Sequence, residues 1–236
     1  MPKRQVDWTL YVVTDKALAG GRSHAAQARA AILGGATVIQ YREKVGNTRQ
    51  LIEEASAVRD VCRELGATFI VNDRVDVALA VAADGVHVGQ EDMPAVIARR
   101  LIGPHRLLGV TVGNVAQALQ SEADGADYLG TDAVFFTGSK PDAGPPIGVG
   151  TLAELCRAVR IPVVGIGGIN AGNVAQVIQA GVAGAAVISA VVSAPDMTVA
   201  ARKLREAISR ARAVSGLGDR IERIRERGDE GGHAAF

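Results

Sequence analysis

The chain alternates short apolar runs with longer stretches that carry apolar residues at three-to-four spacing. Stretches of the second kind, such as 48–65, 115–123 and 171–180, predict amphipathic helices. Eight strand candidates stand between them, at 10–14, 36–40, 68–72, 85–88, 107–111, 126–131, 162–165 and 184–189. Eight strand-then-helix units favour a single (β/α)8 TIM barrel with parallel strands. A doubly wound open sheet stays as the alternative, because periodicity alone does not show that the ring closes.

One domain accounts for most of the chain. Of its 236 residues, 48% are hydrophobic but only 3% are aromatic, so the core must be built from Ala, Val, Ile and Leu. That composition suits buried parallel strands covered by helices. We expect the barrel to occupy residues 1–212. Residues 213–236 carry alternating charges and predict a flexible tail, which leaves open a contact between copies of the chain as a homo-oligomer.

Several classes of function are disfavoured by charge and by sequence pattern. A formal net charge of +1 gives no global attraction to nucleic acid or anionic lipid, so any basic site must be local. Cys62 and Cys156 lie far apart and lack the spacing of metal ligands, which indicates free thiols. The N-terminus shows no signal-like apolar segment, and no uninterrupted run of roughly 18 apolar residues occurs. We expect a cytoplasmic protein with small-molecule partners, and neither a nucleic-acid nor a membrane partner.

A polar ladder follows the second apolar run. Because strand residues alternate faces, Gln40, Arg42 and Lys44 should project together, with Tyr41 and Glu43 on the other side. Two cations and an amide at the exit of a buried strand suit a multiply charged anion. A solvated edge strand is the alternative, since charges on sheet edges are common.

Two carboxylates follow neighbouring strands. Asp73 comes directly after the third strand candidate, within Asn72-Asp73-Arg74, and Asp92 comes just past the fourth. In a barrel both would meet at the same rim and face the cations, which predicts a Mg²⁺ site shared with a phosphate. Each Asp has an ordinary alternative as a helix N-cap, and Asp92 before Met93-Pro94 fits that especially well.

A second anion site is indicated by the loops after the last two strands. Glycines in 165–170 let the backbone approach a ligand closely, and Ile188-Ser189 follows the eighth strand. Barrels frequently hold a phosphate at this location; tight packing without a ligand is the alternative. The long loop after the sixth strand adds Thr137-Gly138-Ser139-Lys140, which is either a flexible polar loop or a bridge between the two anion sites.

The remaining candidates for chemistry are weak. His87, at the end of the fourth strand, is expected to be a structural imidazole rather than a general base, and His24, His105 and His233 have no recognisable partners. No Ser/His/Asp order, nucleophilic Cys context or His cluster for a metal occurs in the sequence.

Taken in order, these blocks resemble the thiamine-phosphate synthase family over roughly residues 8–212. The matching blocks are Gln40-x-Arg42-x-Lys44, Asn72-Asp73-Arg74, 87–92, Gly109-Val110-Thr111, Thr137-x-Ser139-Lys140, 165–169 and Ile188-Ser189-Ala190. The resemblance implies a (β/α)8 barrel that joins 4-amino-2-methyl-5-(diphosphooxymethyl)pyrimidine to 4-methyl-5-(2-phosphoethyl)thiazole. The products would be thiamine phosphate and pyrophosphate, with Mg²⁺ as cofactor.

The resemblance also implies a role for each matching residue. The residues that would hold the pyrimidine diphosphate are Gln40, Tyr41, Arg42, Glu43, Lys44, Asn72, Thr111 and Lys140. Asp73 and Asp92 would bind Mg²⁺. The thiazole phosphate would be held by Thr137, Gly138, Ser139, Gly168, Ile188 and Ser189. The candidate catalytic residues are Arg42, Lys44, Lys140 and Thr111.

Such chemistry is dissociative, because pyrophosphate leaves a benzylic-type carbon and the thiazole nitrogen captures the resulting cation. Charge stabilisation and alignment then matter more than an acid or a base. The sequence departs from the family at Gly113, where a His is frequent, and at Gly130-Thr131-Asp132-Ala133, where a Gly-Pro pair is usual. Two alternatives stay open: a thiazole tautomerase-like isomerase, and a noncatalytic protein that binds thiazole phosphate.

Overall fold

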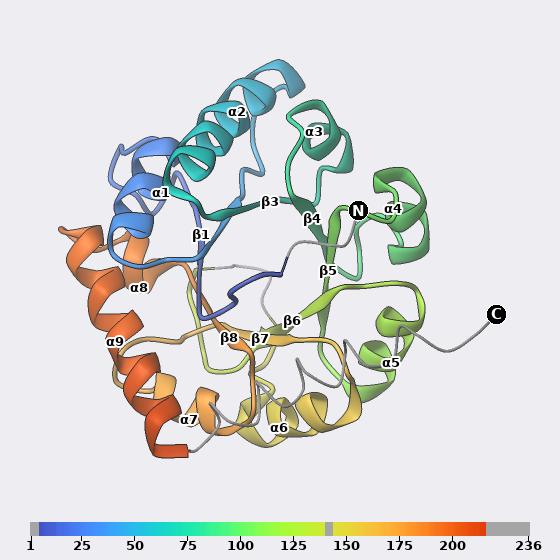
Figure 1. Ribbon diagram of the computed structural model, residues 1–236, viewed down its shortest axis with the longest axis vertical. Helices are drawn as coiled ribbons and strands as arrows, with labels where there is room; N and C mark the ends of the chain where they lie inside the picture. Colours follow the sequence, from blue (N-terminus) through green and yellow to red (C-terminus); the bar gives the residue numbers. More distant parts are fainter. Residues whose placement is uncertain (1–4, 140–143, 216–236) are drawn as a thin grey trace.

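A closed ring of eight parallel strands forms the centre of the molecule (Figure 1). The computed structural model describes residues 5–139 and 144–215 of the chain. The strands are β1 (Leu10–Val13), β2 (Val38–Tyr41), β3 (Thr68–Asn72), β4 (Gly85–Val88), β5 (Leu107–Val112), β6 (Tyr128–Ala133), β7 (Val163–Ile166) and β8 (Gly184–Val187). The ring closes where β1 pairs with β8, with Tyr11 opposite Ala186. The predicted TIM barrel is therefore confirmed, and the open sheet is excluded.

Helices surround the barrel on the outside, as Figure 1 shows. They are α1 (His24–Leu33), α2 (Thr48–Leu65), α3 (Val75–Ala80), α4 (Ala95–Ile102), α5 (Val115–Ala123), α6 (Gly148–Ala158), α7 (Val174–Gln179), α8 (Ser189–Val192) and α9 (Met197–Ser215). The last helix packs against α7 and α1, which are far apart in the sequence. It thereby completes the outer layer next to β1 and β8.

Local capping explains why two helices have the boundaries that the sequence predicts. The Asn47 side chain accepts a hydrogen bond from the Gln50 amide at the start of α2, and Gly66 ends that helix in the left-handed conformation, with φ of 78°. Helix α5 begins in the same way, because the Asn114 side chain accepts from the Gln117 amide. The helix expected at 171–180 begins only at Val174, since the residues before it form a hydrogen-bonded turn.

Two apolar clusters separate the inside of the barrel from the layer beneath the helices. The larger cluster consists mainly of Ala, Val, Ile and Leu, as the composition predicts. The smaller cluster contains three of the few aromatic residues, with the rings of Trp8 and Tyr128 4.3 Å apart between centroids and Tyr11 beside them. These rings fill the part of the barrel interior farthest from the carboxyl ends of the strands.

The last helix, α9, ends at Ser215, shortly after the domain boundary expected at residue 212. Arg212, on α9, donates a hydrogen bond of 2.6 Å to the Thr9 hydroxyl and another to the Ala183 carbonyl, so this helix is anchored to the barrel floor. Residues 216–236 of the expected tail lie outside the described part of the chain.

Cys62 and Cys156 are free thiols, and burial raises the pKa of each to about 12. Among the described residues, no helix has the length and apolar character needed to span a membrane.

Candidate active site

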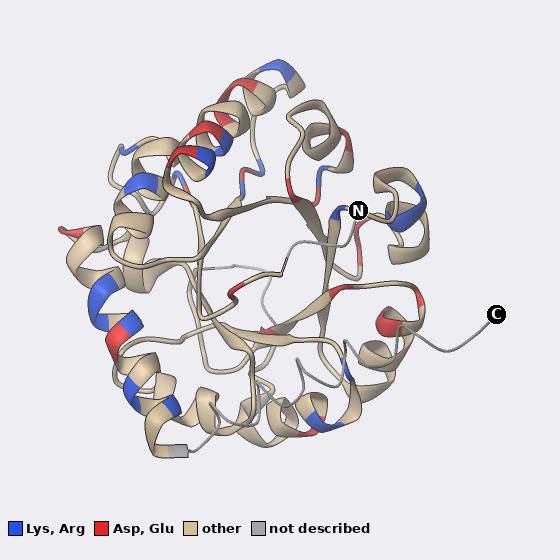
Figure 2. Cartoon of the chain, viewed as in Figure 1, with Lys and Arg blue, Asp and Glu red and all other residues tan. Residues whose placement is uncertain are grey.

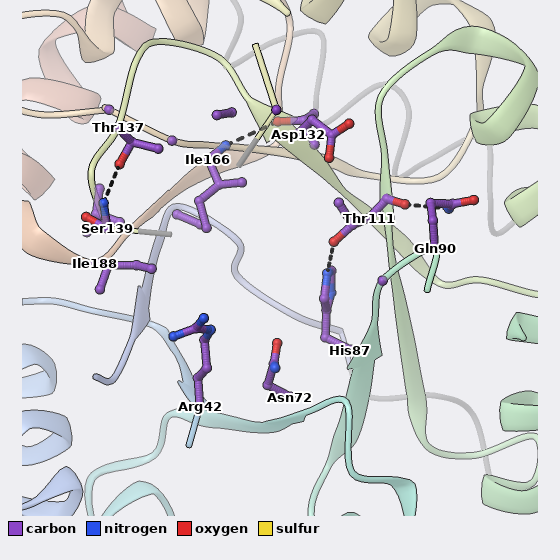
Figure 3. A pocket seen from close by; sticks show the side chains of 18 of the residues that line it. Arg42, Asn72, His87, Gln90, Thr111, Asp132, Thr137, Ser139, Ile166 and Ile188 are labelled. Carbon is purple, nitrogen blue, oxygen red and sulfur yellow. Dashed lines mark hydrogen bonds between the residues drawn. The ribbon is translucent and has the colours of Figure 1, made fainter. Parts of the chain in front are cut away.

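A cavity of about 390 Å³ opens at the carboxyl ends of the strands (Figure 3). Eleven of the fifteen sequence-predicted site residues in the described ranges contribute to its wall. Those that line it are Arg42, Lys44, Asn72, Asp73, Asp92, Thr111, Thr137, Ser139, Gly168, Ile188 and Ser189. Figure 2 shows that Lys, Arg, Asp and Glu lie mainly on the helices and loops around the barrel, so the charges at this rim are a local feature.

The cations of the polar ladder face the cavity and are paired with carboxylates. Lys44 Nζ lies 2.8 Å from Asp73 Oδ2, and Arg42 Nη1 lies 3.0 Å from Asp15 Oδ2. The Arg42 guanidinium points into the cavity in Figure 3, while its Nε is buried and has no hydrogen-bond partner among the described residues. Gln40 lies deeper in the barrel, where its Nε2 donates to the Tyr11 hydroxyl at 2.7 Å.

The assignment of Tyr41 and Glu43 to substrate binding requires correction. Neither residue lines the cavity. The Tyr41 hydroxyl donates to Glu54 Oε2 at 2.9 Å, and Glu43 Oε2 lies 3.4 Å from His24 Nε2, behind the end of β2. The physical reason is strand alternation, which turns these two side chains away from Gln40 and Arg42.

His24 therefore has partners that sequence reasoning missed. Its Nδ1 lies 2.8 Å from the Thr14 hydroxyl, and burial lowers the pKa of the ring. The ligand atoms of His24, Glu43 and Glu54 lie within 4.8 Å of one another. Lys16 and Tyr41 already contact Glu54, so this group is a hydrogen-bonded brace that holds the loop after β2. A His near the start of α1 gave no local signal for these contacts.

Asp73 and Asp92 converge at the rim of the cavity, as the sequence predicted. Burial raises the pKa of Asp73; Lys44 opposes that shift, and the neighbouring carboxylate of Asp92 adds to it. Neither residue is a helix N-cap, because α3 and α4 begin after Arg74 and Pro94 without a side-chain cap. Asp92 instead accepts a hydrogen bond from the Gly89 amide at 2.8 Å.

Asp73 also has an uncommon backbone conformation, with φ of 58°. Side chains other than glycine rarely adopt this left-handed region, and they do so at a cost of about 1–3 kcal/mol that the surrounding structure must offset. The Asp73 amide donates to the His87 carbonyl at 2.7 Å, which holds the turn after β3 against β4. The backbone therefore aims this carboxylate at Lys44 and Asp92.

The loop after β6 meets the ends of β7 and β8 on the opposite side of the cavity. The Ser139 hydroxyl donates to the Ser189 hydroxyl at 3.0 Å, and the Ser139 amide donates to the Thr137 hydroxyl at 3.2 Å. Gly168 has φ of 65°, and a Cβ there would lie 2.5 Å from the Phe136 carbonyl oxygen. The glycine is needed for this close packing. Gly138 is exposed and does not line the cavity, and Lys140 lies outside the described residues.

Four further side chains line the cavity between β4 and β6. His87 Nε2 lies 2.8 Å from the Thr111 hydroxyl, and Gln90 Nε2 donates to the Thr111 carbonyl at 2.7 Å (Figure 3). Asp132 is exposed on the cavity wall, and its Oδ2 would lie 2.3 Å from a Cβ at position 113. Gln117 Oε1 accepts a hydrogen bond from the Gly113 amide. Gln90 belongs to the matching block 87–92, although no role was expected for it, and no sequence pattern pointed to Gln117.

Comparison with known proteins decides the family. A family model described as thiamine monophosphate synthase matches residues 10–191. The chain belongs to this family. A thiamine-phosphate synthase of Chloroflexus aurantiacus is 60% identical over 86% of this chain and 94% of its own length. One of Moorella thermoacetica is 56% identical over 87% of this chain and 98% of its own length.

A solved structure of a related protein has the same fold as this member of the thiamine monophosphate synthase family. Thiamine phosphate pyrophosphorylase from Pyrococcus furiosus superposes with a TM-score of 0.81 at 44% sequence identity. The superposition covers 87% of this chain and 97% of the other. The matched family span, residues 10–191, runs from β1 into α8 and so includes the whole cavity wall described above.

Proposed function

We propose that the cavity carries out thiamine-phosphate synthesis by a Mg²⁺-assisted dissociative substitution. The enzyme is a transferase that joins 4-amino-2-methyl-5-(diphosphooxymethyl)pyrimidine to 4-methyl-5-(2-phosphoethyl)thiazole and releases pyrophosphate. The observation that carries the mechanism is that one cavity brings together cations, a pair of carboxylates and a hydroxyl-lined loop. Arg42 and Lys44 are the cations, and Asp73 and Asp92 are the pair of carboxylates. Ser139 and Ser189 supply hydroxyls on the opposite side of the cavity.

Asp73 and Asp92 are the residues that would hold Mg²⁺. The donor set fits, because Mg²⁺ prefers carboxylate oxygens supplemented by water and substrate phosphate. The raised pKa of Asp73 supports the same assignment: burial and the neighbouring Asp92 disfavour a second negative charge at this point. A divalent cation would supply charge stabilisation for the departing pyrophosphate.

Arg42, Lys44, Asn72 and Thr111 are proposed to bind the diphosphate. Arg42 presents a planar guanidinium that can hold two phosphate oxygens, and its orientation is fixed by Asp15. Lys44 pairs with Asp73 at the cavity wall, with half of its side chain exposed, so its ammonium is available to an incoming anion. Gln40 is proposed to contact the pyrimidine end from below, and Lys140 to approach the diphosphate from the long loop.

The bond changes need no dedicated general base. The bond between the pyrimidine methylene carbon and the bridging oxygen breaks, and the electron pair leaves with pyrophosphate. The thiazole nitrogen then donates its lone pair to the same carbon, which gives the thiazolium product. Arg42 and Lys44 favour this step because they hold positive charge where negative charge grows. The barrel walls keep the two reactants in line and limit access of water to the cation.

The thiazole phosphate is proposed to lie between the β6–α6 loop and the end of β8. Thr137, Ser139 and Ser189 offer hydroxyl donors there, and Gly168 leaves the backbone open to close approach. Ile188 is 6% exposed and points into the cavity in Figure 3, so it supplies an apolar wall. This placement puts the thiazole opposite Arg42 and Asn72.

Location and assembly are further proposals. We propose a cytoplasmic enzyme, because Cys62 and Cys156 are both free thiols, as is usual for proteins of a reducing compartment. A homo-oligomer is proposed only as a role for residues 213–236, whose alternating charges could pair between copies.

The direct test is an assay for thiamine phosphate and pyrophosphate with both substrates, in Mg²⁺ and in EDTA. We expect equal amounts of the two products, formed only with metal. Activity that persists at full rate in EDTA would contradict the metal assignment. Turnover of a thiazole carboxylate phosphate without pyrimidine or Mg²⁺ would identify a tautomerase-like isomerase instead. Saturable binding of thiazole phosphate without product would identify a noncatalytic binding protein.

A further inference from the structure

A continuous chain of hydrogen bonds crosses the barrel interior and ends at the cavity. Gln40 Nε2 donates to the Tyr11 hydroxyl at 2.7 Å, and that hydroxyl lies 3.0 Å from the Tyr128 hydroxyl. Tyr128 in turn lies 3.0 Å from His87 Nδ1, and His87 Nε2 lies 2.8 Å from the Thr111 hydroxyl. We call Gln40, Tyr11, Tyr128, His87 and Thr111 the interior chain.

The fold builds space for this chain. A Cβ at Gly109 would lie 2.2 Å from the Tyr128 ring and 2.3 Å from His87 Nδ1, and a Cβ at Gly130 would lie 2.9 Å from His87 Cε1. Real Cβ atoms do not come this close, so glycine at both positions is required by the two rings. The two glycines lie on β5 and β6, the same strands that carry Thr111 and Tyr128. The positions of Tyr128 and His87 in the interior chain therefore depend on glycine at both sites.

Burial fixes the protonation of both phenols. Tyr11 and Tyr128 are almost completely buried, and desolvation raises the pKa of each above its ordinary value. Each hydroxyl therefore keeps its one proton and can donate one hydrogen bond. A neutral imidazole has one N–H donor and one bare nitrogen acceptor, so in that form His87 presents opposite characters to its two neighbours.

These counts give the interior chain a direction. The Gln40 amide nitrogen can only donate, so the Tyr11 hydroxyl accepts from it and donates its own proton to the Tyr128 hydroxyl. Tyr128 then donates to His87 Nδ1, which must be the bare nitrogen. The proton of the imidazole consequently sits on Nε2 and is donated to the Thr111 oxygen. Only the Thr111 hydroxyl proton remains without a partner inside the interior chain, and Thr111 lines the cavity.

We propose that the interior chain holds His87 in its Nε2-protonated form, so that Thr111 is an obligate hydrogen-bond donor to an anionic oxygen of the substrate. The inference rests on the proposed function, in which Thr111 contacts the pyrimidine diphosphate. His87 and Tyr128 are positioning residues, because they act through Thr111. The proposal extends their role beyond packing: they determine which way a hydroxyl at the diphosphate site points its proton.

The opposite direction is a defined alternative. If the Gln40 amide were turned so that its oxygen accepted from Tyr11, each following donor would reverse. His87 would then be protonated on Nδ1, and Thr111 would donate to His87 Nε2 rather than to substrate. Apart from the exchanged oxygen and nitrogen of the Gln40 amide, the two directions have the same heavy-atom positions and differ in where the protons lie.

Nitrogen NMR of the histidine-labelled protein separates the two directions without substrate. The resonances of His87 are identified by their loss in the His87→Gln variant. We expect the wild-type ring to be protonated on Nε2, with Nδ1 showing the shift of a hydrogen-bond acceptor. The Tyr128→Phe variant should move the Nδ1 resonance toward that of a nitrogen without a donor. A wild-type ring protonated on Nδ1 would overturn the proposal.

Steady-state kinetics then test the consequence for substrate. In His87→Gln the amide nitrogen can replace Nε2 as a donor to Thr111, whereas His87→Met offers no donor. A hydrogen bond to a charged group is worth roughly tenfold or more in affinity. We therefore expect His87→Met to raise KM for the pyrimidine diphosphate on the order of tenfold, and His87→Gln to recover most of that loss. KM for the thiazole phosphate should change little in either variant.

Equal kinetic effects of the Gln and Met variants, both folded by thermal unfolding, would refute the donor role. A wild-type protein that makes no thiamine phosphate would refute the proposed function, yet the NMR result on His87 would stand. The two failures are therefore distinguishable.

Discussion

The clearest prediction concerns Asp92, because its replacement should strengthen the metal-free protein while removing metal binding. In the absence of a cation, the Asp92 carboxylate lies beside the partly buried Asp73 and helps to raise its pKa. Two unit charges about 4 Å apart repel by about 4 kcal/mol at an effective dielectric constant of 20. Lys44, 2.8 Å from Asp73, offsets most of that repulsion. We expect Asp92→Asn to stabilise the protein in EDTA by on the order of 1 kcal/mol.

The hydrogen bond to Gly89 should survive this change, because the Asn side-chain oxygen can still accept from the Gly89 amide, now 2.8 Å from Asp92 Oδ2. For a chain of this size, 1 kcal/mol corresponds to a rise in Tm of about 2–4 °C. With Mg²⁺ at 100 times its Kd the wild-type protein should gain about 2.7 kcal/mol, and the variant should gain little. The order of the two Tm values should therefore reverse between EDTA and Mg²⁺.

The pH dependence has a definite sign. Because the folded pKa of Asp73 lies above its ordinary value of 3.8, the folded state binds the proton more tightly than the unfolded state. The stability that Asp73 contributes is present below that value and is lost as the pH rises through the folded pKa. Part of this loss comes from Asp92, so the advantage of Asp92→Asn should be present at neutral pH and vanish below about pH 3.8.

Thermal unfolding in EDTA and in Mg²⁺ measures these differences. Asp76→Asn is the matched control, since Asp76 lies outside the cavity and pairs with Arg74 at 2.7 Å. That variant should lose at most about 1 kcal/mol of stability and should keep the full Mg²⁺ response. An Asp92→Asn variant that is less stable than wild type in EDTA, or that retains the wild-type response to Mg²⁺, would contradict the proposed metal site.

Three further variants test other parts of the site. Ser189→Ala removes the hydroxyl that accepts a hydrogen bond from Ser139, so KM for the thiazole phosphate should rise by about three- to tenfold. KM for the pyrimidine diphosphate should not change to match, and kinetics with each substrate varied separately measure both values. Gly113→Ala should lower kcat/KM, because its Cβ would lie 2.3 Å from Asp132 Oδ2. The loss should be smaller when Asp132 is also replaced by Ala, and equal losses in both backgrounds would show that the two positions act independently. Burial lowers the pKa of His24 below 6.5, so the protein loses stability as the pH falls below that value. The Tm of His24→Gln should therefore decrease less than that of wild type between pH 7 and 5, and an equal decrease would contradict this.

Local sequence patterns predicted the barrel elements because each strand and helix has its own signal. Apolar runs marked all eight strands, and Asn47 and Asn114 began helices where the periodic pattern began. Closure of the ring had no such signal. It depends on the pairing of Tyr11 with Ala186, which are far apart in the sequence. Only the number of strand-then-helix units and the family resemblance pointed to it.

The same distinction applies to the site. Alternation correctly separated Arg42 and Lys44 from Tyr41 and Glu43, yet matching the whole segment to a family motif assigned all of them to substrate. The alternation was the better guide, because it reports the direction of each side chain. The partners of His87 are not encoded locally at all, since they come from β5 and β6 and meet only when the barrel closes.

The two departures from the family also become one feature in three dimensions. Gly113 and Asp132 are separated along the chain, but a side chain at position 113 would occupy the space that the Asp132 carboxylate fills. Where the family frequently has a His at the first position, this chain has no side chain there and places a carboxylate from β6 beside the same point. The exchange keeps the cavity wall filled. Gly113 and Asp132, which motivated the noncatalytic alternative, are therefore consistent with an intact cavity.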